Sequence, residues 1–80
     1  MTIEEIFEEA RIRGLRLNNF AQLADGVFHA NFRIDDGHNE IWFAPISRRM
    51  DPREALHDAL KTALSKMPKK FSGVQQDLFG

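Results

Sequence analysis

The side chains best suited to acid–base or metal chemistry are the three histidines, His29, His38 and His57. His38 lies close in sequence to Asp35, Asp36 and Glu40, and this grouping comes nearest to a set of metal ligands. A run of the Asp-Asp-Gly-His-Asn type is also typical of a turn, and no second cluster supplies further ligands. Cysteine is absent, and no serine stands near the histidine and acid that would activate it. We therefore expect no enzymatic activity, no metal and no cofactor.

A different kind of chemistry, binding through a peptide, is indicated by the segment Gln75-Gln76-Asp77-Leu78-Phe79. Leu78 and Phe79 are two large apolar side chains in a polar stretch, and such a pair can fill a hydrophobic cleft on a partner. Gln75 can donate and accept hydrogen bonds that fix the register, and Asp77 can accept one. The pattern predicts a docking peptide. The alternative is that Leu78 and Phe79 fold back onto the domain as a clasp.

This segment resembles the pentapeptide by which bacterial proteins bind the replicative sliding clamp. The family pattern is Gln, usually Leu, then Ser or Asp, then Leu and Phe, and four positions match it: Gln75, Asp77, Leu78 and Phe79. Gln76 stands where Leu is commoner, which bears on affinity. The resemblance implies a bacterial sliding clamp as the partner and a non-enzymatic adaptor or inhibitor as the function.

Positive charge suited to a nucleic-acid partner gathers at Arg48, Arg49 and Arg53. These arginines alternate with Asp51, Glu54 and Asp58, and the formal net charge of the whole chain is −1. The chain as a whole therefore has no general attraction to a polyanion. Nucleic-acid binding through the three arginines is the alternative function, and arginines that merely solvate a loop are the simpler explanation.

Two helices are expected to frame the chain. Thr2 and Glu5 form a capping box, and Gly14 can close the first helix in the left-handed conformation. Asp51 and Pro52 are an N-cap and a first helical residue for the second helix, which Pro68 ends. Each helix has an apolar stripe at helical spacing: Ile3, Ile6, Phe7 and Ala10 in the first, and Leu56, Ala59, Leu60, Ala63, Leu64 and Met67 in the second.

Three strands are predicted between the helices, over residues 15–23, 27–34 and 40–46, with 47–50 as a linker. In the first strand the alternation places Leu15, Leu17, Ala21 and Leu23 on one face, with a bulge near Asn19 and Phe20. Asp25-Gly26 is a hairpin signal, and Pro45 must end a strand or lie on an edge. Trp42 and Phe43 are neighbours and therefore point to opposite faces.

The predicted fold class is α+β: a helix, a three-stranded antiparallel sheet and a second helix, with both helices on one face. We expect a domain over residues 1–67 and a flexible tail over 68–80. The element order resembles the double-stranded RNA-binding domain, whose members place lysines at the start of the second helix to meet phosphates. Here Arg48, Arg49 and Arg53 occupy that region, while the first helix has four glutamates. The stretch Leu15–Phe20 also resembles small phage and prophage proteins.

Length and composition fit one small domain of 80 residues with 42% hydrophobic residues. No apolar run approaches the roughly 20 residues that cross a bilayer, and the acidic start of the chain does not resemble a secretory signal. We expect a cytoplasmic protein without a membrane partner. A third possible function is self-association through the strand near Trp42, because an exposed strand edge can pair with a second copy.

Overall fold

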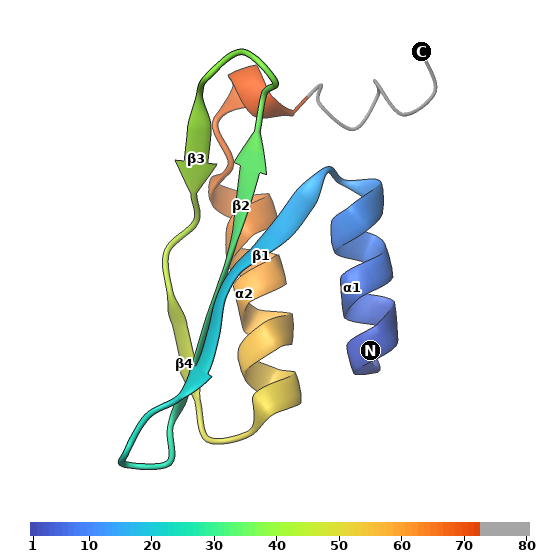
Figure 1. Cartoon of the computed structure of the whole chain (residues 1–80). Coiled ribbons are helices and arrows are strands. Elements are labelled where there is room, and N and C mark those ends of the chain that lie inside the picture. The colour runs from blue at the N-terminus through green and yellow to red at the C-terminus, as the bar shows by residue number, and fades with distance from the viewer. Residues whose placement is uncertain (73–80) are drawn as a thin grey trace.

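The protein is described by a computed structural model over residues 1–72, in which two helices lie against one antiparallel sheet (Figure 1). The class is α+β, as the sequence predicts. The elements in chain order are α1 (Ile3–Ile12), β1 (Leu15–Gln22), β2 (Phe28–Asp35), β3 (Ile41–Phe43), β4 (Ser47–Arg49), α2 (Pro52–Lys66) and the short 3-10 helix η1 (Lys69–Phe71).

Both long helices begin at the caps that the sequence predicts. The Thr2 hydroxyl accepts a hydrogen bond from the Glu5 backbone N–H, and the Glu5 carboxylate accepts one from the Thr2 backbone N–H. These two bonds satisfy amide groups that have no partner inside the helix. The Asp51 carboxylate does the same for the Glu54 N–H at the start of α2. Gly14, with φ of 77°, follows the end of α1 in the left-handed conformation.

β2 is the central strand of the sheet, because β1, β3 and β4 all pair with it in antiparallel fashion. The predicted third strand over 40–46 is wrong in extent, since β3 ends at Phe43. The predicted linker over 47–50 is also wrong, since Ser47–Arg49 is a strand beside Phe28–Ala30. Pro45 explains the interruption: it has no N–H to give to the ladder, so the chain leaves β2 and returns to it two residues later.

The bulge predicted in the first strand is confirmed between Leu17 and Asn19, where the register with β2 shifts. Because of this extra residue, the later side chains of β1 point to the opposite face of the sheet from the one that simple alternation predicts. Phe20 lies opposite Ala30 and turns to the helix side, where its ring stacks on Phe28 with centroids 5.9 Å apart. Ala21 lies opposite His29 and turns away from the helices, so the expectation that it shares a face with Leu15 is wrong.

The core lies between one face of the sheet and the two helices (Figure 1). Ala30, Phe32 and Ile34 project from β2 into this core, and Leu56, Ala59, Leu60 and Ala63 project from α2. The first helix covers the same face, since the Phe7 ring meets the Phe32 ring edge-on with centroids 6.3 Å apart. The expectation that both helices pack on one face of the sheet is confirmed.

The folded unit extends past residue 67, where the predicted tail was to begin. After Pro68 the chain forms η1, and the Phe71 side chain is buried in the core with 2% of its surface exposed. Lys70 forms an ion pair with Glu40 beside the β2–β3 turn. Because Phe71 belongs to the core, the predicted boundary at residue 67 falls before the domain ends.

Candidate functional site

The predicted docking residues, Gln75 to Phe79, lie outside the described part of the chain. The buried side chain that precedes them most closely in the described chain is Phe71. Phe71 is buried in the core, and the short helix η1 that contains it lies beside the β2–β3 turn (Figure 1). Gln75 follows Phe71 by four positions, so their Cα atoms lie at most about 14 Å apart.

The three predicted nucleic-acid arginines do not form one cluster. The Arg49 guanidinium pairs with Asp58 of α2, with Nη2 and Oδ2 3.1 Å apart. Arg53 donates from Nη1 to the backbone carbonyl of Met1 at 3.2 Å. Arg48 points to the other side of the sheet, because its neighbour in the strand register is His29. The three residues are close in sequence. Alternation along β4 nevertheless directs Arg48 and Arg49 to opposite faces of the sheet, and Arg53 lies on α2.

Arg48 instead joins a face of the sheet that α1 and α2 do not cover, which we call the open face. One row across the strands holds Arg16, Arg33 and Phe43, directly opposite one another in register. A second row holds Ala21, His29 and Arg48. The two rows are four residues apart along β2, which corresponds to about 13 Å.

Amide side chains occupy the space between these two rows. Asn18, the residue at the bulge, donates from Nδ2 to Oδ1 of Asn31 at 3.1 Å. Asn19 is the register neighbour of Asn31 on this face. The open face thus carries polar and basic side chains along its middle, with apolar side chains such as Phe43 toward its ends.

Sequence reasoning did not identify Arg16 and Arg33 as members of a site. Both sit in plainly alternating strands, and their positions on the outer face of each strand were predictable. Their placement directly opposite each other depends on the register of β1 with β2, which a local pattern does not reveal.

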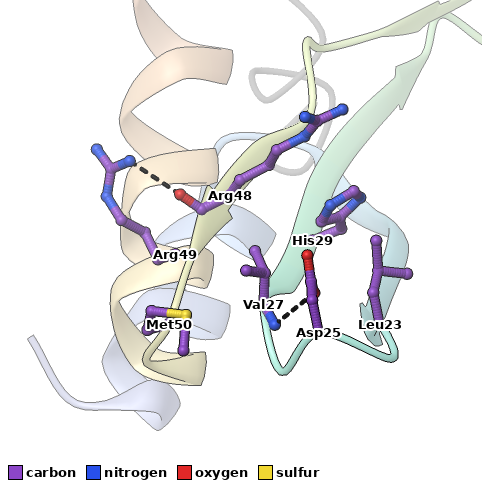
Figure 2. Close-up of a pocket in the computed structure, with 7 residues that line it drawn as sticks. All are labelled: Leu23, Asp25, Val27, His29, Arg48, Arg49 and Met50. Carbon is purple, nitrogen blue, oxygen red and sulfur yellow. Dashed lines mark hydrogen bonds between the residues drawn. The ribbon is translucent and has the colours of Figure 1, made fainter.

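A groove lies at the end of the open face near the β1–β2 turn (Figure 2). It has a volume of about 520 Å³, within the range usual for small-ligand pockets. Its lining residues are Leu23, Asp25, Val27, His29, Arg48, Arg49 and Met50. In Figure 2 the Arg48 side chain extends from β4 toward β2, the strand that carries His29, whereas the Arg49 side chain points in the opposite direction. The Asp25 carboxylate is used within the turn, where it accepts a 3.0 Å bond from the Val27 N–H.

The acidic turn around His38 is explained by backbone hydrogen bonds. The Asp36 carboxylate accepts from the N–H groups of His38 at 2.6 Å and Glu40 at 3.2 Å. The bond from His38 holds the pKa of Asp36 below its ordinary value. Within residues 1–72, no three histidine or acidic side chains are grouped so as to hold a metal ion. His57, on α2, has its pKa lowered by burial and then by Lys61.

The paired aromatic residues point to opposite faces, as predicted. Trp42 is half-buried and packs against the core, whereas Phe43 is 54% exposed on the open face. The strand that carries them has three residues, and the chain leaves the ladder after Ala44, whose N–H donates to the Phe32 carbonyl, and rejoins it at Ser47. The sheet edge formed by β3 and β4 is therefore short and interrupted. Short, interrupted edge strands disfavour pairing with a strand of a second copy.

Comparison of the chain with protein-family models, with curated proteins and with solved structures gave no match. Of the helices in residues 1–72, none is long and apolar enough to cross a membrane.

Proposed function

We propose that the chain is a non-enzymatic adaptor or inhibitor that docks on the bacterial sliding clamp through Gln75–Phe79. The observation that carries the proposal is the match of four motif positions a few residues beyond a firm anchor, the buried Phe71. Burying Leu78 and Phe79 in a cleft contributes roughly 1.5–3 kcal/mol each before the cost of ordering the peptide.

The short connection from Phe71 to Gln75 determines what docking achieves. With at most about 14 Å of chain between them, the domain is held against the clamp rather than on a long tether. A domain held this way either presents its own surface beside the clamp or obstructs other proteins that need the same cleft. The second candidate, duplex RNA binding by Arg48, Arg49 and Arg53, gains little support, because these residues are separated and Arg49 is paired with Asp58.

The test is a titration of purified bacterial sliding clamp with the full chain by calorimetry. We expect saturable binding, and a Leu78→Ala/Phe79→Ala double variant that binds at least about 100-fold more weakly, given the burial of both side chains. Phe43→Ala/Ile46→Ala is the matched control, since it removes two exposed apolar side chains from the folded domain. Equal affinity of the original chain and the tail variant, or no binding by either, would end the proposal.

A gain-of-affinity variant gives a further test of the register. Gln76 stands where the clamp-binding pattern usually has Leu, so Gln76→Leu should bind more tightly if the five residues occupy the cleft as proposed. A Gln75→Leu change at the neighbouring position removes the hydrogen-bonding amide and should weaken binding. If both changes shift affinity in the same direction, the peptide does not bind in this register.

A further inference from the structure

The arginines of this protein divide into two groups according to whether the side chain has an ion-pair or hydrogen-bond partner. Four of the seven have a partner within residues 1–72: Arg11 with Glu8, Arg13 with Glu9, Arg49 with Asp58, and Arg53 with the Met1 carbonyl. The remaining three side chains have none among the described residues: Arg16, Arg33 and Arg48. The register places all three of these on the open face.

The arrangement of these cations is unfavourable in the absence of an anion. Arg16 and Arg33 are directly opposite each other on neighbouring strands, where like charges destabilise a sheet. Within the described chain, the acidic residue that β2 places on the same face is Asp35, two residues from Arg33, and its carboxylate accepts a hydrogen bond from the Gly37 N–H in the β2–β3 turn. A negatively charged ligand lying between the two guanidinium groups would relieve this repulsion, and guanidinium is well matched to phosphate.

Apolar and aromatic groups lie at both ends of this basic surface. Phe43 is directly opposite Arg33, and more than half of its surface is exposed. At the other end, beside Arg48 and His29, the groove has walls formed by Leu23, Val27 and Met50 (Figure 2). Alternating cationic and aromatic or apolar groups are the features that hold unpaired bases and their phosphates.

We propose that the open face binds single-stranded nucleic acid. Arg16, Arg33 and Arg48 contact phosphates along one strand, a base stacks on Phe43, and another base enters the groove near Met50. A duplex fits less well, because paired bases do not expose their faces to Phe43. In the duplex-binding fold that the chain resembles, the first helix enters the minor groove, and here α1 carries Glu4, Glu5, Glu8 and Glu9.

The proposal is tested by fluorescence anisotropy with labelled 20-nucleotide oligomers of deoxythymidine and of uridine and with a duplex DNA of equal length. We expect the single strands to bind at low salt, and log K to fall against log salt concentration with a slope of about −2 for three phosphate contacts. The two single strands distinguish DNA from RNA. No binding of either single strand at 50 mM salt, or tighter binding of the duplex, would overturn the proposal.

Two triple variants with the same change in net charge distinguish binding by the open face from non-specific attraction by the whole protein. Arg16→Gln/Arg33→Gln/Arg48→Gln should weaken binding at least about tenfold and flatten the salt dependence, and Phe43→Ala should weaken it about tenfold through lost stacking. Arg11→Gln/Arg13→Gln/Arg53→Gln removes the same charge from the helix layer and should leave affinity within about twofold. Equal losses in the two triple variants would show that only net charge matters, and the proposal would fail.

Two further measurements distinguish a loss of nucleic-acid binding from unfolding and from an effect of the docking peptide. Arg33→Gln removes a like-charge contact, so its melting temperature should equal or exceed that of the original chain. A loss of binding therefore cannot be attributed to unfolding, and a lower melting temperature would contradict the repulsion on which the argument rests. Leu78→Ala/Phe79→Ala should bind the single strand as the original chain does, since the open face acts independently of clamp docking.

Discussion

The side-chain amide of Asn31 donates a 2.9 Å hydrogen bond from Nδ2 to the backbone carbonyl of Ala44, and both residues are buried. Ala44 lies where the chain leaves β3 before Pro45. The pairing of β2 with β3 and β4 is interrupted between these two strands. The Asn31 side chain supplies a hydrogen bond to the Ala44 carbonyl at this interruption. Asn31 is therefore a structural polar residue in the middle of β2.

Replacing Asn31 with Ala should destabilise the domain by about 1–3 kcal/mol, because the Ala44 carbonyl would be left without a partner in a buried place. Urea denaturation followed by the fluorescence of Trp42 measures the change. Asn19→Ala is the control, since this amide shares the open face and is exposed; its effect should stay within about 0.5 kcal/mol. Similar losses in the two variants would refute a specific role for the Asn31 bond.

Phe71 should contribute to stability as a core residue, although it follows the second helix and two lysines. Phe71→Ala should cost about 3–5 kcal/mol, as other buried phenylalanines do, and Phe71→Leu should cost less because it leaves a smaller cavity. Phe43→Ala, at an exposed position, should change the free energy of unfolding by under about 0.5 kcal/mol. If Phe71→Ala were as mild as Phe43→Ala, the domain would end before residue 71.

The capping box makes part of the stability depend on pH. Hydrogen bonds from the backbone and side chain of Thr2 lower the pKa of Glu5 below its ordinary value of 4.5. A carboxyl whose pKa is lower in the folded state stabilises the fold above the unfolded pKa, and this contribution is lost as pH falls through the folded pKa. The original chain should therefore lose more stability between pH 6 and pH 3 than Glu5→Gln, which keeps a capping side chain without titrating.

Thermal melting at both pH values measures that difference. Glu4→Gln removes the same charge from the same helical turn, but Glu4 lacks the reciprocal bond to Thr2. The change in melting temperature of Glu4→Gln between pH 6 and pH 3 should resemble that of the original chain more closely than that of Glu5→Gln. Identical pH dependence in the original chain and in Glu5→Gln would show that the box does not contribute.

The features predicted correctly from the sequence are those fixed within a few residues. Caps at Thr2 and Asp51 depend on side chains that bond to backbone groups three residues away, and the bulge near Asn19 disturbs a visible alternation. The α+β order follows from these local signals. The strand at Ser47–Arg49 was missed because three residues show no periodicity, and only pairing with distant Phe28–Ala30 makes them a strand.

The remaining differences share a dependence on residues far apart in sequence. Phe71 follows Pro68 and two lysines, so its surroundings suggested the end of the fold, yet its partners are core residues from other elements. The three arginines predicted as one group are separated for the same reason. Arg48 and Arg49 are adjacent in the chain, but the pleat of β4 sends one to the open face and the other to Asp58.

The central position of β2 also has a consequence for the order of folding. Since β1, β3 and β4 each pair only with β2 within the described sheet, no ladder can form until Phe28–Asp35 is extended. The transition state should therefore already contain β2 and at least one neighbour. Conservative core truncations in β2, such as Ile34→Val, should mainly slow folding, whereas truncations in α1, such as Ile6→Val, should mainly speed unfolding in stopped-flow experiments. The reverse pattern would mean that the helices assemble first and the sheet forms on them.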